Sequence, residues 1–191
     1  MHTKPAIHDD DPAPSAAPAL WLIRAAALGG LAITGYLFVL AARGGAPLGC
    51  GEASSCADVL SSTWSKVGPL PVRVPEMVAS LVILAASLHA GPASPATHRQ
   101  QASRIIGVVA VAAGGAALWF IGLQLFELKH ICVFCMSAHA CSLFILIAAL
   151  VRGPRFLPLA GLAGVAALVV TQILMPPPAG QLGPGGITGL D

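Results

Sequence analysis

The chain has 191 residues, of which 56% are hydrophobic and only 9% are charged, and its formal net charge is +2. Its mean hydropathy is +0.82. Soluble globular domains carry about 25% charged residues, so this composition excludes that class. We expect an all-α integral membrane protein.

Five apolar stretches are candidates for membrane-spanning helices. A hydrocarbon layer about 30 Å thick requires about 20 apolar residues of helix. The stretches that approach or exceed this length are Ala19–Ala42, Val74–Ala90, Ile105–Phe126, Cys132–Val151 and Phe156–Met175. The second is the weakest, because it is short and carries Glu76 near its start. Glycine pairs at 29–30 and 114–115 would let helix backbones approach closely, which suits a compact bundle.

The first stretch resembles a secretory signal peptide in its position, but the residues before it argue against cleavage. They include Asp9, Asp10 and Asp11, whereas a signal peptide begins with positive charge and has a shorter apolar core. We therefore expect a retained span that follows a disordered cytoplasmic segment at residues 1–18. Residues 176–191 are rich in Pro and Gly and predict a disordered periplasmic tail.

Lys and Arg residues predict the orientation in the membrane. Five spans place the chain ends and loops on two sides of the membrane. The Lys and Arg residues of one side are Lys4, Arg24, Arg99, Arg104, Arg152 and Arg155. Those of the other side are Arg43, Lys66, Arg73 and Lys129. The excess of positive charge marks the cytoplasmic side, which predicts a cytoplasmic N-terminus and a periplasmic C-terminus in a bacterial inner membrane. The loop at 43–73 and the turn at 127–131 then share the periplasmic side, where disulfides are permitted.

Cys132 and Cys135 have the C-x-x-C spacing of thiol redox centres and open the fourth span. A helix start offers free N–H donors and the positive end of the helix dipole, and both stabilise a thiolate. The two residues are one turn apart and face the same side. The same spacing is also typical of half a metal site. Cys141 lies about 240° further round the helix from Cys135, and we expect it to be a small core residue.

Cys50 and Cys56 form a second pair in the loop between the first two spans. Cys50 lies in a Gly-rich stretch that can move, whereas Cys56 follows two serines that predict a capped, short amphipathic helix continuing to Val67. A flexible pair beside a rigid membrane-edge pair supplies what disulfide exchange needs. The alternatives are a static disulfide that closes the loop and a Cys₄ metal site. We expect no metal.

Together these motifs resemble the vitamin K epoxide reductase family, in particular its bacterial disulfide-forming members. The resemblance covers roughly residues 19–151 and rests on Cys50-x5-Cys56, Val59-Leu60 and Ser62, Gly68-Pro-Leu-Pro71, and Cys132-x-x-Cys135. The disulfide bond protein B family has similar chemistry but places its C-x-x-C in the first external loop. The order of the motifs here therefore favours the vitamin K epoxide reductase family.

The resemblance implies a four-helix bundle around a quinone, either ubiquinone or menaquinone, with a peripheral fifth transmembrane helix at residues 152–175. It implies that a thioredoxin-like partner attacks Cys56 and that Cys50 passes the electrons to Cys132. Cys135 would be the sulfur nearest the quinone. Ser62 matches a loop hydroxyl that positions the loop cysteines or the substrate.

The chain departs from the family pattern in two places. Human-type members carry Thr-Tyr-Ala after the redox pair, where this chain has Ala138-His139-Ala140. We hypothesise that His139 replaces the tyrosine as a hydrogen-bond donor to a quinone oxygen; the alternative is a histidine bonded to a neighbouring helix. Many bacterial members also continue into a fused thioredoxin-like domain, whereas this chain continues into its Pro- and Gly-rich tail. We therefore expect a separate periplasmic thioredoxin-like partner.

The expected function is that of a membrane thiol-disulfide oxidoreductase that supports disulfide bond formation. No nicotinamide or flavin fingerprint is present, and no nucleic-acid partner is expected. Two alternatives stay open. In the first, the physiological role of the enzyme is to reduce quinone or quinone epoxide rather than to form disulfides. In the second, the chain is a non-enzymatic membrane protein, such as a transporter, with structural disulfides. Against a transporter, the spans show no charge pair of the kind that a transport path needs.

Overall fold

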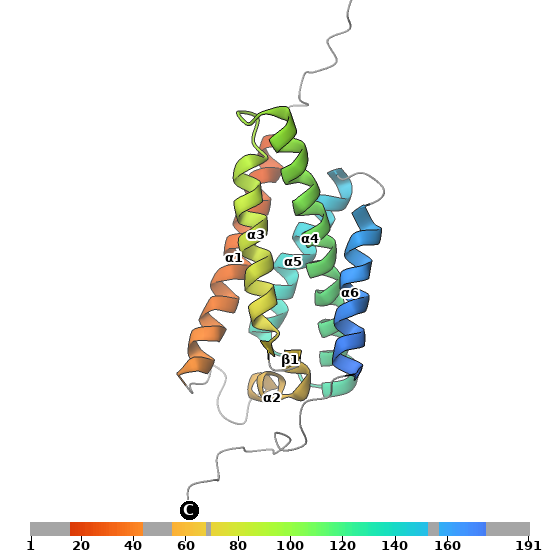
Figure 1. The fold of residues 1–191 in the computed structure, drawn as a ribbon. Helices are drawn as coiled ribbons and strands as arrows, with labels where there is room; N and C mark the ends of the chain where they lie inside the picture. The colour runs from red at the N-terminus through yellow and green to blue at the C-terminus, as the bar shows by residue number, and fades with distance from the viewer. Residues whose placement is uncertain (1–15, 44–54, 68–69, 153–156, 175–191) are drawn as a thin grey trace, which may run out of the picture.

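A computed structural model describes residues 16–43, 55–67, 70–152 and 157–174 of the chain. This part is almost entirely helical, which confirms the all-α expectation. The long helices are α1 (Ala16–Ala42), α3 (Arg73–His89), α4 (Ala96–Gly122), α5 (Val133–Arg152) and α6 (Leu157–Leu174). They run side by side, and the short helix α2 (Ser55–Ser61) lies at one end of the bundle (Figure 1).

Four of the long helices form a ring. Helix α1 packs against α3, α3 against α4, α4 against α5, and α5 against α1. Helix α6 packs on the outside of α4 and also contacts strand β1 (Lys66–Val67). The described helices are therefore arranged as a four-helix ring with one outer helix.

All five stretches expected to span the membrane form helices, but their lengths differ. Within the described residues, three segments are long and apolar enough to cross a membrane, namely Pro18–Ala42, Ala96–Leu128 and Val133–Val151. Helix α3 has only 17 residues, which cover about 25 Å at about 1.5 Å per residue. The apolar part of α6 is shorter still, at Gly161–Leu174. Helix α4 begins at Ala96, earlier than the expected Ile105, because polar residues extend it beyond its apolar stretch.

The two glycine pairs lie where helices approach one another closely, as the sequence predicted. A Cβ atom added to Gly29 would lie 3.5 Å from Sγ of Cys141, and one on Gly30 would lie 3.4 Å from Oγ of Ser80. A Cβ atom on Gly114 would lie 2.6 Å from Cδ2 of Leu146, so there is no room for a side chain between α4 and α5. Small residues thus permit the tight packing of the ring.

The loop segment after α2 differs from the expected helix. Helix α2 ends at Ser61, a 3₁₀ turn η1 follows at Thr63–Ser65, and β1 pairs antiparallel with β2 (Leu70–Pro71). The expectation that the helix continues to Val67 is therefore wrong. Ser62 has an extended backbone (ψ 155°), and its Oγ donates a hydrogen bond of 2.8 Å to the carbonyl oxygen of Val59, which closes the helix end.

Helix α4 continues directly into η2 (Leu123–Leu128), a π-helical segment, before the chain turns back into α5. The turn begins at Lys129, whose φ of 54° is left-handed and ends the helix. This connection brings the last turns of α4 against the start of α5, which is the C-x-x-C segment.

Candidate functional site

Cys132 acts as the N-cap of α5. Its carbonyl oxygen accepts a 2.9 Å hydrogen bond from the N–H of Met136, and its Sγ accepts one of 3.4 Å from the N–H of Cys135. The N–H of Cys132 donates to Oε1 of Gln124 at 2.9 Å. The sulfur thus occupies the place of an N-cap side-chain acceptor, at the positive end of the helix dipole. The expectation that this helix start surrounds a sulfur with donors is confirmed for Cys132.

Cys132 lies one residue before the membrane-spanning segment Val133–Val151. A hydrogen bond from the Cys135 thiol lowers the pKa of Cys132 from 9.0 to about 6, and backbone donors and the positive charge of Arg73 act in the same direction. A thiolate is the attacking species in disulfide exchange, and the lowered pKa favours this form of Cys132.

Cys56 lies directly against this helix start. Cys56 (4% exposed), Val59 and Cys132 (0% exposed) form one buried cluster, with Cys135 packed at its edge. Cys56 is disulfide-bonded, whereas Cys132 and Cys135 are free thiols. Cys50 lies outside the described residues. A disulfide-bonded Cys56 cannot serve as a thiolate ligand, which argues against the Cys₄ metal site.

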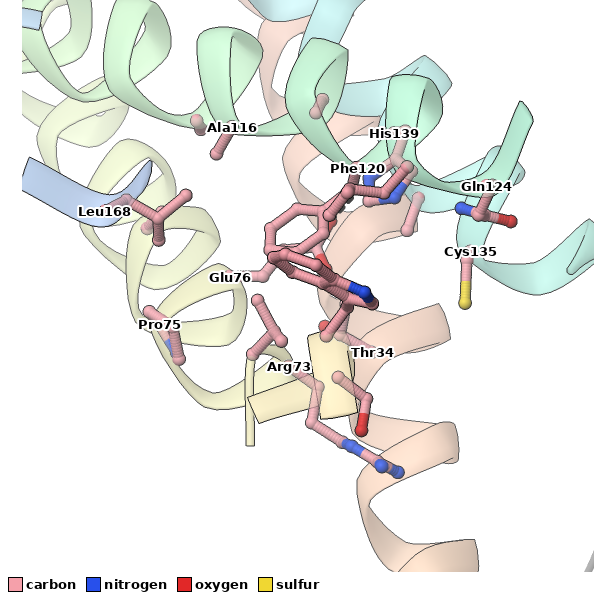
Figure 2. Close-up of a pocket in the computed structure, with 18 of the residues that line it drawn as sticks. Thr34, Arg73, Pro75, Glu76, Ala116, Phe120, Gln124, Cys135, His139 and Leu168 are labelled. Atoms are coloured by element: carbon pink, nitrogen blue, oxygen red, sulfur yellow. Dashed lines mark ion pairs between the residues drawn. The ribbon is translucent and has the colours of Figure 1, made fainter. Parts of the chain in front are cut away.

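A cavity of about 320 Å³ opens between the helices next to Cys135. Its walls are mostly Ala, Val and Leu side chains, and its polar lining residues are Thr34, Ser62, Ser65, Arg73, Glu76, Gln124 and His139. Figure 2 shows Cys135, Gln124 and His139 along this wall. Of the predicted site residues, Ser62, Cys135 and His139 line the cavity, whereas Cys56 and Cys132 do not line it and pack against Cys135.

The fifth long helix contributes to the cavity wall. Gly164, Val165 and Leu168 of α6 line the cavity. Gln172 fixes this helix, because its Oε1 accepts the Nε1–H of Trp119 at 2.8 Å and its Nε2 donates to the carbonyl oxygens of Trp64 and Lys66. Helix α6 lies outside the four-helix ring, as expected, and it also lines the cavity.

Cys141 lies outside the cavity. It packs near Gly29 and Gly30 of α1 and is not among the residues that line the cavity. The sequence predicted that it faces away from the redox pair, and the structure agrees.

His139 lies beside an acidic residue inside the bundle. Its ring stacks on Phe120, with centroids 6.0 Å apart, and its Nδ1 lies 3.8 Å from Oε1 of Glu76. That nitrogen is buried and has no hydrogen-bond partner in the described part of the chain. Glu76 and His139 are therefore two ionisable side chains in contact inside the bundle, and they form a charge pair only when the imidazole is protonated.

Three further polar residues of the site were missed by the sequence reasoning, namely Gln124, Arg73 and Gln172. Gln124 is 2% exposed and Gln172 is 7% exposed. Arg73 donates from Nη1 to the carbonyl oxygen of Leu37 at 2.9 Å and so joins α3 to α1. A polar side chain within an apolar span is a signal that could have identified both glutamines.

The comparison with protein families agrees with this geometry. The sequence profile of the vitamin K epoxide reductase family matches residues 21–150, a range that includes both cysteine pairs and nearly all of the four-helix ring. No curated protein sequence matches the chain. The match covers more than half of the 191 residues. The apolar helices make the chain an integral membrane protein, and the match makes it an oxidoreductase of the vitamin K epoxide reductase family.

Proposed function

We propose that this protein reoxidises a separate thioredoxin-fold partner on the periplasmic side and passes the electrons through two cysteine pairs to a quinone. One observation carries the proposal. Cys132 shares a buried cluster with the disulfide-bonded Cys56, while Cys135, one turn away, lines the cavity. The C-x-x-C pair therefore connects the external loop with the interior of the bundle.

We place the loop cysteines in the order Cys50, Cys56, Cys132, Cys135. The family resemblance implied that the partner attacks Cys56, but a sulfur that is 4% exposed and packed against Cys132 is poorly accessible to another protein. Cys132, Cys135 and Cys141 are free thiols, and we infer that Cys50, the other cysteine of the loop, is the disulfide partner of Cys56. Cys50 then receives the partner, and Cys56 exchanges with Cys132.

The relay balances over three steps. The partner's two thiols reduce the Cys50–Cys56 disulfide and form the partner's own disulfide. The loop thiols then reduce a Cys132–Cys135 disulfide and are reoxidised. The inner pair finally returns to its disulfide as two electrons and two protons pass to the quinone. The structure has an oxidised Cys56 and reduced Cys132 and Cys135, which corresponds to the state before this last step.

The cavity residues fit a quinone, either ubiquinone or menaquinone. Ligand sites of this kind have apolar walls and a few polar groups that fix orientation. A bound quinone supplies the two-electron acceptor. Cys135 presents its sulfur at the wall, and His139, held by stacking on Phe120, offers a hydrogen bond to a quinone oxygen. The Oγ of Ser62 already donates to Val59, so we assign Ser62 to holding the end of α2.

The membrane orientation follows from the charge distribution. The end of the bundle that carries α2 and the start of α5 belongs to the set of loops with fewer Lys and Arg residues. We therefore place this end in the periplasm and the α3–α4 connection in the cytoplasm. This orientation gives Cys50 and Cys56 access to an exported thioredoxin-fold protein.

The test uses purified protein in liposomes that contain ubiquinone or menaquinone. A reduced thioredoxin-fold protein is added, and both quinol formation and oxidation of the added protein are measured. Turnover should be lost in Cys132→Ala and in Cys135→Ala, and retained in the control Cys141→Ala, which alters a packing residue. Normal turnover in both variants would refute the relay. If a small dithiol supports turnover at the same rate as the protein donor, quinone reduction is the better assignment than reoxidation of a protein partner.

Trapping experiments test the order of the loop cysteines. A partner that has lost its resolving cysteine should form a mixed disulfide with Cys50 in the Cys56→Ala variant. The complementary variant Cys50→Ala should trap much less partner, because Cys56 is buried. Equal or stronger trapping on Cys56 would restore the order that the family resemblance implied.

A further inference from the structure

Glu76 and His139 form an ionisable pair that the thiol relay does not use. Glu76 lies near the start of α3 and His139 lies on α5, so the fold brings them together from different helices. Both line the cavity with Cys135 (Figure 2). Ionisable side chains within membrane spans are costly and mark functional sites, so this pair calls for a role.

Building on the function proposed above, we propose that Glu76 and His139 share one proton and deliver it to the bound quinone when Cys132 and Cys135 are oxidised. Glu76 is the new residue in this assignment, and it acts through His139. The proposal rests on their position at the wall of the cavity and on the unpartnered Nδ1 of His139.

The geometry supports a proton path through the imidazole. Oε1 of Glu76 lies 3.8 Å from Nδ1 of His139, which is longer than a hydrogen bond. Contacts of this kind often tighten only when substrate is bound. Stacking on Phe120, with an interplanar angle of 10°, fixes the ring plane while permitting a small sliding movement. An imidazole can release a proton at Nε2 while it accepts one at Nδ1.

The proton balance explains why a second donor is needed. Oxidation of the inner pair forms one S–S bond and releases two electrons, and the acceptor takes up two protons with them. Cys135 is a thiol and supplies one proton. The hydrogen bond from the Cys135 thiol lowers the pKa of Cys132, so Cys132 is the sulfur that enters this step as a thiolate and supplies no proton.

His139 supplies the second proton from Nε2 and regains it at Nδ1 from Glu76, which becomes a carboxylate. The total charge is the same before and after, since the negative charge moves from Cys132 to Glu76. A proton from the aqueous side then returns Glu76 to its acid form before the next turnover. The charged or titratable groups near Glu76 are Arg73 on its own helix and Cys135 and Cys141 on α5.

The first test uses the reduced protein mixed rapidly with quinone, so that only the last step is measured. Glu76→Gln keeps the shape of the side chain but cannot give up an acidic proton. We expect it to slow quinone reduction at least tenfold and to increase the solvent deuterium isotope effect, with partial recovery in Glu76→Asp. The matched control is Glu127→Gln, which makes the same change at an exposed position outside the cavity.

The second test does not depend on activity. In quinone-free protein labelled with ¹⁵N-histidine, the Nδ1 resonance of His139 should shift in Glu76→Gln and stay unchanged in Glu127→Gln. An unchanged resonance in Glu76→Gln overturns the shared proton, and so does quinone reduction by this variant at the wild-type rate with the wild-type isotope effect. If the wild-type protein itself reduces no quinone, the proposed function has failed, and the resonance still decides whether the two side chains share a proton.

Discussion

Replacing Gly114 by alanine tests whether close packing of α4 against α5 sets the geometry of the site. The added Cβ atom would lie 2.6 Å from Cδ2 and 2.7 Å from Cβ of Leu146, whereas ordinary contacts are 3.4–4 Å. Helix α5 must therefore move away from α4 by a substantial fraction of an ångström, because the Cβ atom of Leu146 cannot rotate out of the way.

The expected cost is that of an overpacked core, about 1–3 kcal/mol. For a chain of this size each kcal/mol lowers Tm by about 2–4 °C, so Gly114→Ala should lower Tm by roughly 2–12 °C. Because α5 carries Cys135 and His139, the displacement should also slow quinone reduction.

Thermal unfolding in detergent, followed by circular dichroism, measures this effect. The matched control is Gly35→Ala in α1, where an added Cβ atom meets nothing within 4 Å. This control should be stabilised by about 0.5–1 kcal/mol, because alanine is a better helix former than glycine. The double variant Gly114→Ala/Leu146→Gly removes the clashing Cβ and Cδ2 atoms of residue 146 and should show a favourable coupling of at least about 1 kcal/mol. Equal stability of Gly114→Ala and Gly35→Ala would refute the reasoning.

Three further predictions concern polar groups of the site. In reduced, quinone-free protein the thiolate absorbance of Cys132 should persist at pH 7 and disappear as the pH falls through about 6, because the hydrogen bond from the Cys135 thiol lowers its pKa. Gln124→Leu leaves the N–H of Cys132 buried without an acceptor and should lower the free energy of unfolding by about 1–3 kcal/mol, measured by thermal unfolding. Gln172→Leu removes the acceptor of the Trp119 Nε1–H and should cost a similar ~1–3 kcal/mol while exposing the segment at β1 to proteolysis.

Each of these predictions has its own control. Cys132→Ala should lack the absorbance change, and a change that persists in this variant assigns the thiolate to another residue. Gln101→Leu makes the same substitution at an exposed position of α4 and should leave the stability nearly unchanged. If Gln101→Leu destabilises the protein as much as Gln124→Leu or Gln172→Leu, the buried hydrogen bonds are not the cause.

Much of the site could be predicted from spacing along one helix. Cys132 and Cys135 are one turn apart, so their common side and their place at a helix start follow from local geometry. The same geometry excludes Cys141 and puts His139 on the side of Cys135. The burial of Cys56 against Cys132 could not be predicted in this way, because it depends on where α2 docks on the bundle. The end of α2 was also misjudged, since apolar residues up to Val67 fit either a helix or the extended backbone of β1.

The sequence by itself determined that this protein lies in a membrane, where its long helices fall, and which family it belongs to. These properties depend on composition and on the order of short motifs, and neither requires knowledge of how helices cross. Only the tertiary structure decided that Glu76 lies beside His139, that Gln124 holds the N–H of Cys132, and that α6 lines the cavity. The reason is physical: each of these contacts joins segments whose relative position is set by side-chain packing between helices, and such packing leaves no periodic signal in the chain.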